Sequence, residues 1–157
     1  MKEQILEAFR DLGFKLEEEE GMGYCFNYEG LNLLYMYNEN DEEFLNIALP
    51  GIVEVEEDRM LQICALLEKI NSTLKYVKTY MLGNSVWLFY ERELFGEEDL
   101  MTVISRMILH LEAGLVFARK AMAEIEETMA NDSSADDTAE SAEEIVTEEI
   151  ADDEDIE

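Results

Sequence analysis

The 157-residue sequence has one proline, two cysteines and one histidine, and no lysine or arginine follows Lys120. The two cysteines, Cys25 and Cys64, each lie in an apolar stretch, so we expect two small core residues and no disulfide. No stretch approaches the roughly 18 apolar residues of a membrane span, and the N-terminus lacks a continuous apolar signal region. The sequence therefore predicts a cytoplasmic protein that folds without a disulfide or a metal.

Residue patterns typical of an enzyme are also missing. The only histidine, His110, lies in a helical stretch where no serine or cysteine nucleophile can be placed beside it. The glycines of "GMG" at 21–23 precede a strand, whereas a phosphate-binding loop precedes a helix. The segment "NENDEE" at 38–43 has Glu43 where a calcium loop needs glycine. We expect a non-enzymatic protein without a cofactor or metal.

Negative charge dominates and is unevenly distributed. The net charge is −28, and residues 131–157 contain 13 acidic residues and no basic one. Residues 1–130 keep 26 acidic against 11 basic residues, a balance of −15. This charge disfavours direct binding to DNA, RNA or an anionic membrane, and it favours protein partners with basic segments. The composition predicts a folded domain at 1–130 and a disordered acidic tail at 131–157.

The spacing of apolar residues predicts an α+β fold. Helical spacing indicates helices near 2–12, 57–71 and 97–129, and alternation indicates strands at 22–28, 31–37 and 44–49 and a hairpin at 76–94. Pro50 is expected to end the third strand, and "FKLEEEEG" at 14–21 is expected to be a solvated edge or loop. The order α-β-β-β-α-β-β-α predicts two layers, with helices packed on an antiparallel five-stranded sheet.

The last predicted helix is longer than the sheet beneath it. Residues 97–129 would form a helix of roughly 48 Å, while a strand of six or seven residues spans about 20 Å. Its apolar positions continue to Met129, and Gly114 is a candidate bend. Two interpretations stay open: a partner covers the overhang, or the helix folds back over the edge of the sheet.

The hairpin carries large apolar residues on both faces. Gly83-Asn84 suits a two-residue turn, which pairs Leu82 with Ser85. Moving away from the turn one residue at a time on each strand then pairs Met81 with Val86, Tyr80 with Trp87, and so on. One face then consists of Val77, Thr79, Met81, Val86, Leu88 and Tyr90, which suits packing under helices. The other face consists of Tyr76, Lys78, Tyr80, Trp87, Phe89 and Glu91.

Aromatic rings bordered by one charge of each sign are typical of a protein interface. We therefore interpret Tyr76, Lys78, Tyr80, Trp87, Phe89 and Glu91 as a homodimer contact or a site for a protein client. The alternative is that this face is core beneath another layer, with Lys78 reaching out to solvent.

Three short motifs accompany the predicted order of elements: "LP" at Leu49-Pro50, "LLEKIN" ending at Asn71, and "VWLFYEREL" at 86–94. With them, the order of elements over about residues 2–125 resembles the class I type III secretion chaperone-like fold, and the sequence looks most like its YbjN-like branch. The resemblance implies an antiparallel sheet with helices packed on it, a common tendency to form homodimers, and no catalytic residues.

The resulting hypothesis is a dimeric protein-binding module, chaperone-like or a regulatory adaptor. A client strand could add to a sheet edge, or a client helix could lie on the aromatic face. The alternative is an acidic nucleic-acid mimic that occupies the basic groove of a partner protein. A further alternative is that the tail folds over basic residues near Lys75 and Arg92 as self-inhibition.

Overall fold

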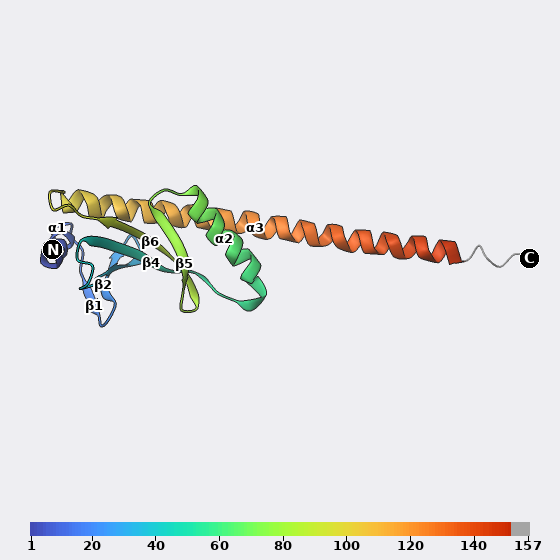
Figure 1. The fold of residues 1–157 in the computed structure, drawn as a ribbon, viewed down its shortest axis with the longest axis horizontal. Coiled ribbons are helices and arrows are strands. Elements are labelled where there is room, and N and C mark those ends of the chain that lie inside the picture. Colours follow the sequence, from blue (N-terminus) through green and yellow to red (C-terminus); the bar gives the residue numbers. More distant parts are fainter. Residues whose placement is uncertain (152–157) are drawn as a thin grey trace, which may run out of the picture.

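The computed structural model describes residues 1–151, with side chains as far as Ser134. The helices are α1 (Lys2–Asp11), α2 (Met60–Thr73, preceded by the 3-10 turn η1, Glu57–Arg59) and α3 (Leu100–Ala151). The strands are β1 (Glu17–Glu19), β2 (Gly23–Tyr28), β3 (Leu31–Met36), β4 (Phe44–Glu54), β5 (Val77–Leu82) and β6 (Ser85–Glu93) (Figure 1). The α+β class and the order of the predicted elements are confirmed.

The tail predicted at 131–157 lies outside the described side chains from residue 135 onward. Residues 131–134 are part of α3. The expected disorder of the tail stays a prediction.

All six strands form one sheet in the order β1-β2-β3-β4-β6-β5, with antiparallel neighbours throughout. The sheet has one strand more than expected, because Glu17–Glu19 pairs with Cys25, Tyr24 and Gly23 as a short solvated edge. The strands β4 and β6 pair at the centre of the sheet, although α2 and β5 lie between them in the sequence. The two sheet edges are therefore β1 and β5.

Pro50 does not end the third predicted strand, contrary to expectation. The strand β4 continues through it to Glu54, and the pairing with β6 shifts register between Leu49 and Val53. Proline has no N–H to give to a ladder, and a bulge is one of the few places where a sheet tolerates it. Gly51 follows with a φ of 64°, a conformation suited to glycine.

The β5–β6 hairpin has the predicted register. The pairs Leu82–Ser85, Met81–Val86, Tyr80–Trp87, Thr79–Leu88, Lys78–Phe89 and Val77–Tyr90 all form. The two faces of the hairpin are therefore separated as the alternation predicted, from Val77 onward.

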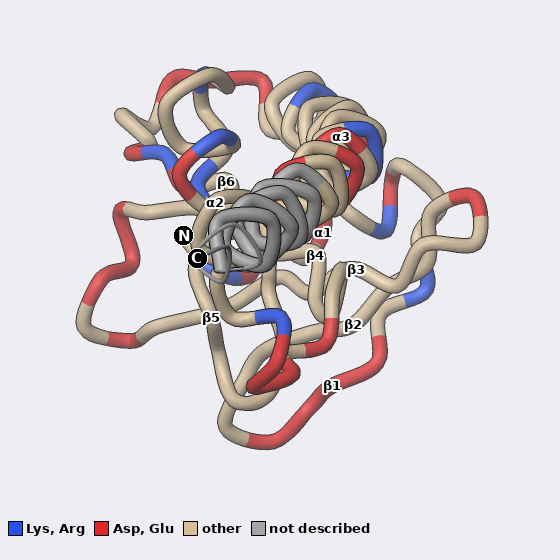
Figure 2. Tube along the Cα trace, turned by 90° about the vertical axis from the view of Figure 1, so that its right-hand side faces the viewer, with Lys and Arg blue, Asp and Glu red and all other residues tan. Residues whose placement is uncertain are grey.

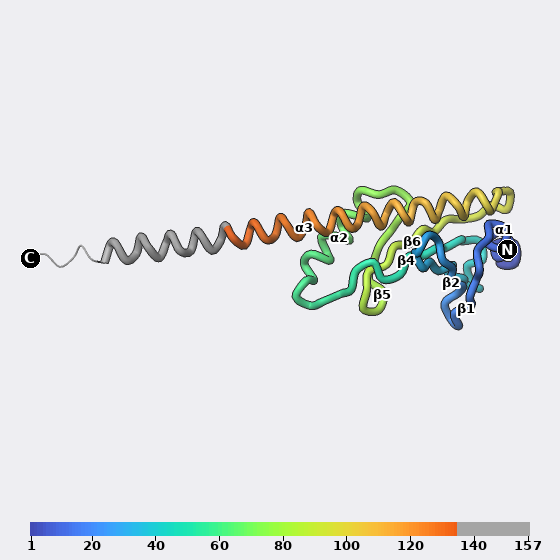
Figure 3. The backbone as a smooth tube through the Cα atoms, turned by 180° about the vertical axis from the view of Figure 1, so that it is seen from behind, coloured from blue at the N-terminus to red at the C-terminus, as the bar shows by residue number. Residues whose placement is uncertain are grey.

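The helices share one side of the sheet with the main hydrophobic core. Phe9 of α1, Ile70 of α2 and Leu111 of α3 are fully buried in a cluster with strand residues that include Ile47 and Leu88. Figures 1 and 3 show α3 running along the sheet, and Figure 2 shows the molecule along this helix. The opposite side of the sheet has no helix among residues 1–134.

The helix α3 continues past the sheet without folding back, so that interpretation is wrong for the described part of α3 (Figure 3). Its first turns beyond the sheet pack on α2, where Lys69 Nζ donates to Glu124 Oε2 at 2.9 Å and Arg59 pairs with Glu126. No bend is needed at Gly114, where a Cβ would lie 3.4 Å from Leu88 Cδ1. This glycine instead lets the helix lie close to the sheet.

The segment Leu100–Ser134 is long and apolar enough, by length and composition alone, to cross a membrane, with a mean hydropathy of 1.5 in its most apolar window. The expectation that no stretch approaches a span is therefore wrong by this measure. Of that window, 39% is buried inside the domain. A helix that covers a sheet needs the same apolar composition.

Candidate functional site: the open face of the sheet

The face of the sheet away from the helices is the candidate functional site, and we call it the open face. Strand alternation assigns to it side chains from five strands. They include Cys25, Leu34, Met36, Phe44, Asn46, Ala48, Lys78, Tyr80, Trp87, Phe89 and Glu91. Five of the six predicted site residues lie here, all except Tyr76.

A small second hydrophobic cluster forms the centre of the open face. Leu34, Ala48 and Phe89 are direct cross-strand neighbours in one row, and each is almost completely buried. None of the three belongs to the main core under the helices. Ala48, the smallest of the three, lies between its two larger neighbours in the row. The open face therefore has a packed floor.

Two aromatic rings cover this floor. Tyr80 stacks on Phe89 with ring centroids 4.1 Å apart, and Trp87 stacks on the same ring at 5.9 Å. The indole N–H of Trp87 donates to Ser85 Oγ at 2.9 Å, which fixes the orientation of the ring. Phe89 has no exposed surface as a result, while Tyr80 keeps 39% of its own. Tyr80 and Trp87 are thus the aromatic groups that a partner would meet first.

A polar group lies beside the aromatic rings. Lys78 forms an ion pair with Glu91, and Asn46 Nδ2 donates to Glu91 Oε1 at 2.8 Å. The Lys78 side chain is 51% exposed and that of Glu91 30%, so we expect the ion pair to stabilise the fold by no more than about 1 kcal/mol. The Oδ1 atom of Asn46 is buried and has no hydrogen-bond partner among the described residues.

Tyr76 does not lie on the open face, contrary to expectation. It precedes β5 with a φ of 68°, and this left-handed conformation interrupts the alternation that would pair it with Glu91. Its ring lies on the helix side, stacked on Tyr90 at 5.6 Å and edge-on to His110 at 5.2 Å. Tyr76 therefore belongs to the corner between β6 and α3.

Both edges of the sheet are protected. At the β5 edge, Asn71 Nδ2 donates to the Thr79 carbonyl at 3.0 Å, and Asn71 Oδ1 accepts from the Thr79 N–H at 2.8 Å. The amide thus occupies the N–H and carbonyl of Thr79, one pair of the backbone groups that an added strand would use. At the other edge β1 is three residues long and consists of exposed glutamates, and short charged edges resist strand pairing.

Sequence reasoning missed the role of Asn71, although it is the last residue of the "LLEKIN" segment. A polar residue at the end of an amphipathic helix, just before a strand, was the available signal. The helix pattern alone does not show that α2 packs beside β5.

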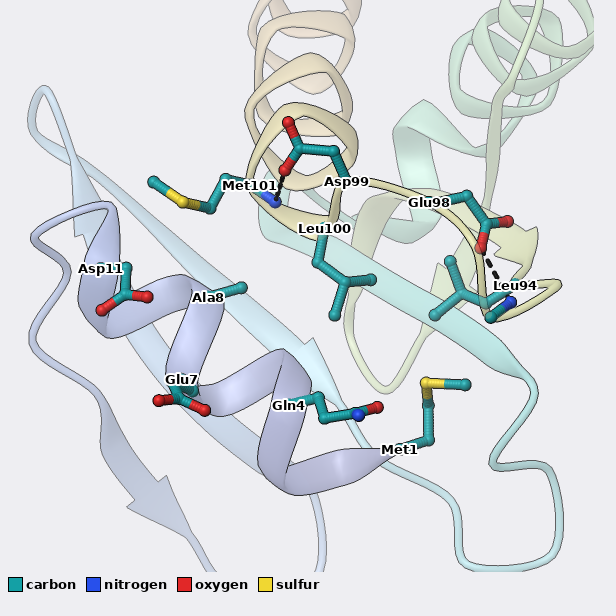
Figure 4. A pocket seen from close by; sticks show the side chains of 11 residues that line it. Met1, Gln4, Glu7, Ala8, Asp11, Leu94, Glu98, Asp99, Leu100 and Met101 are labelled. Carbon is teal, nitrogen blue, oxygen red and sulfur yellow. Dashed lines mark hydrogen bonds between the residues drawn. The ribbon is translucent and has the colours of Figure 1, made fainter.

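A hollow of about 340 Å³ lies between α1 and the start of α3, and four acidic side chains line it (Figure 4). Two of these carboxylates already accept hydrogen bonds from backbone N–H groups. Glu98 accepts from the N–H groups of Phe95 and Gly96, and Asp99 accepts from those of Met101 and Thr102. The backbone N–H of Phe95 is the main cause that lowers the pKa of Glu98, and the Thr102 hydroxyl lowers that of Asp99. The Glu98 and Asp99 carboxylates therefore cap the start of α3, and the hollow lies beside this cap.

The described residues offer few groups for catalysis. His110 Nδ1 bonds to the Arg106 carbonyl at 2.7 Å, so this nitrogen carries the proton and the ring is held against its own helix. Burial, with Glu19 and Glu17 nearby, raises the pKa of the Cys25 thiol, which disfavours the reactive thiolate. No three His, Cys, Asp or Glu side chains within residues 1–134 are grouped to hold a metal ion.

Both cysteines are free. Cys25 is half-buried and Cys64 is exposed. The expectation of a core residue is therefore wrong for Cys64.

No protein-family model and no curated protein matches the chain. Solved structures do match it, at low sequence identity. The structure of YbjN from E. coli is similar with a TM-score of 0.59 and 14% identity, over 76% of this chain and 92% of that one. The structure of an uncharacterized protein from Methanothermobacter thermautotrophicus is similar with a TM-score of 0.52 and 17% identity, over 81% and 97%. The resemblance to YbjN is thus confirmed at the level of the fold, and this chain has a YbjN-like fold.

Proposed function

We propose that this protein is a non-enzymatic protein-binding module, chaperone-like or a regulatory adaptor, which acts as a homodimer and uses the open face for its contact with a second copy or with a client. The observation that carries the proposal is the pair of stacked rings on the sheet face that has no helix among residues 1–134, where Tyr80 is 39% exposed and Trp87 is half-buried. Tyrosine and tryptophan are enriched at the energetic centres of protein interfaces, because they offer large rigid contact areas with a polar end.

The protected edges support contact through the face. A client strand adding to the sheet would have to displace Asn71 from Thr79 at one edge, or lie against Glu17–Glu19 at the other. A helix or a second sheet can instead lie across the open face without breaking any hydrogen bond of the sheet.

The charge supports a basic partner. Acidic residues outnumber basic ones around the sheet and the helices (Figure 2), and the balance over residues 1–130 is −15. Long-range attraction would speed the capture of basic segments and weaken as salt rises, with a screening length of about 8 Å at physiological ionic strength.

YbjN from E. coli is provisionally described as a transcription regulator. If this chain had a related role, its charge would favour action through a protein rather than through direct contact with DNA. Cytoplasmic location is part of the same proposal.

The acidic nucleic-acid mimic is the second candidate. Three adjacent glutamates on the β1 edge and 13 acidic residues after residue 130 are the observations that favour it. A chain ending at Ser134 should lose most of its affinity for a basic partner protein under this alternative. Under the leading proposal it should keep binding through the open face.

The test compares three variants of the full chain by light scattering coupled to size exclusion, and by capture of partners from native lysate. Tyr80→Lys and Trp87→Lys place a charge on the open face, and Leu61→Lys makes the same change at a residue of α2 that is 70% exposed. We expect the first two variants to lose the dimer or the captured partner while Leu61→Lys keeps both. A monomeric wild-type protein whose partners are unchanged in both open-face variants would overturn the proposal.

A further inference from the structure

A hollow of about 330 Å³ lies at the end of the open face, beside the polar group. It lies along a cross-strand row in which Met36 pairs with Asn46 and Asn46 pairs with Glu91. Its lining includes Met22, Met36, Asp41, Phe44, Asn46 and Glu91. Carboxylates, an amide and large apolar side chains thus surround one space.

The Oδ1 atom of Asn46 is the buried side-chain acceptor without a donor among the described residues. The orientation of the amide is determined by its other atom, since Nδ2 must donate to the Glu91 carboxylate. A buried acceptor left without a donor costs roughly 1–3 kcal/mol. A position that keeps this cost is a candidate for a contact made only in a complex.

The walls of the hollow suit the aliphatic part of a long side chain. Met22 and Phe44 are 40% and 43% exposed. Met36 lies on β3, directly opposite Asn46 on the neighbouring strand. Methionine side chains are flexible and adapt to a bound group, so they can move aside to open the path to Asn46 Oδ1.

We propose that this hollow binds an arginine side chain of the protein partner, with the guanidinium donating to Asn46 Oδ1 and to the carboxylate of Glu91 or Asp41. This inference rests on the proposed function and identifies what the open face recognises. Arginine fits better than lysine, because its planar fork of five N–H donors can serve an amide oxygen and a carboxylate at the same time.

Lys78 is an internal competitor for this site. Its ammonium pairs with Glu91. The Lys78 side chain lies on the same face of the sheet and is about half exposed. A bound guanidinium would share or replace that contact. Removing the Lys78 charge should therefore strengthen the binding of arginine.

The probe is the peptide acetyl-Gly-Arg-Gly-amide, followed by NMR on the labelled full chain. The control peptide replaces arginine with citrulline, which has a similar shape and no charge. We expect the arginine peptide to shift the backbone signals of Met36, Asn46 and Glu91 together with the Asn46 side-chain amide, and the citrulline peptide to bind about tenfold more weakly.

Two variants locate the contact. Asn46→Leu removes the acceptor at similar size and should weaken arginine binding about tenfold without loss of folding, since it also removes the unpaired oxygen. Asn32→Leu makes the same change at an exposed position of the neighbouring strand and should bind like the wild type. Lys78→Met should tighten binding several-fold.

Equal binding of the two peptides, shifts confined to other surfaces, or unchanged binding by Asn46→Leu would each overturn the inference. These outcomes are separable from failure of the proposed function. Arginine can still bind at Asn46 even if Tyr80→Lys and Trp87→Lys leave the dimer and partners unchanged. Likewise, those variants can abolish the dimer or the partner even if arginine does not bind at Asn46.

Discussion

Gly23 lies so close to Tyr35 on the adjacent strand that a Cβ on this glycine would be 1.9 Å from the Tyr35 carbonyl oxygen. Its φ of 142° is also a conformation that residues with side chains rarely adopt. The glycine therefore allows β2 to begin at the point where it pairs with the end of β3.

Gly23→Ala should destabilise the protein by about 3 kcal/mol or more, because the backbone must move to remove the clash. Gly21→Ala is the matched control, since Gly21 has a φ of 77° but open space around its Cα, and it should cost only about 1 kcal/mol. Urea unfolding followed by Trp87 fluorescence measures both. Equal costs for the two variants would contradict the role assigned to Gly23.

Asn71→Leu should open the β5 edge. Two hydrogen bonds to Thr79 are lost, for an expected destabilisation of about 1–3 kcal/mol, and the freed backbone groups should promote edge pairing between molecules. The measurements are urea unfolding and light scattering over a range of protein concentrations. Ser72→Ala, at an exposed position next to Asn71, should change neither, and a soluble Asn71→Leu protein of wild-type stability would refute the edge role.

Phe89→Ala and Lys78→Met separate packing from charge on the open face. Phe89 is fully buried beneath Tyr80, so its truncation should cost about 3–5 kcal/mol. Lys78→Met breaks a half-exposed ion pair and should change stability by less than about 1 kcal/mol. A small effect of Phe89→Ala in thermal unfolding would show that the floor of the open face does not hold the sheet together.

Acid should weaken the cap of α3. The pKa of Glu98 is lowered in the folded protein, chiefly by the Phe95 N–H, so its contribution is complete above the ordinary carboxyl pKa of about 4.5 and is lost as the pH falls through the lower folded value. Glu98→Gln should therefore lose stability at neutral pH and show a flatter decline below pH ~4.5. Urea midpoints between about pH 2.5 and 7 test this; parallel curves for wild type and variant would exclude the contribution of Glu98.

Regular alternation is what made much of this fold predictable from sequence. The register of the β5–β6 hairpin follows from Gly83-Asn84 and the period of two, and Tyr80, Trp87 and Phe89 share a face for that reason. Tyr76 departs from the pattern because a single positive φ reverses the direction of its side chain, and composition does not reveal such a conformation.

Other features depend on tertiary contacts. Glu17–Glu19 has the composition of a loop and becomes a strand only because β2 offers it a partner. Pro50 ends most strands, but the bulge in β4 accommodates it. The hollow beside Asn46 combines residues from β3, β4 and β6, and no local pattern indicates that these strands meet there.

The central β4–β6 pairing also has a consequence for how the chain folds. Residues 44–54 must find residues 85–93, with α2 and β5 between them, before the middle of the sheet exists. Such non-local pairing makes folding slow, and until it is complete the apolar strand residues are exposed to other chains. The net charge of −28 would keep unfinished molecules apart by mutual repulsion. We therefore expect refolding yield to fall as salt is raised, so that the acidic composition would protect the newly made chain as well as select the partner of the finished one.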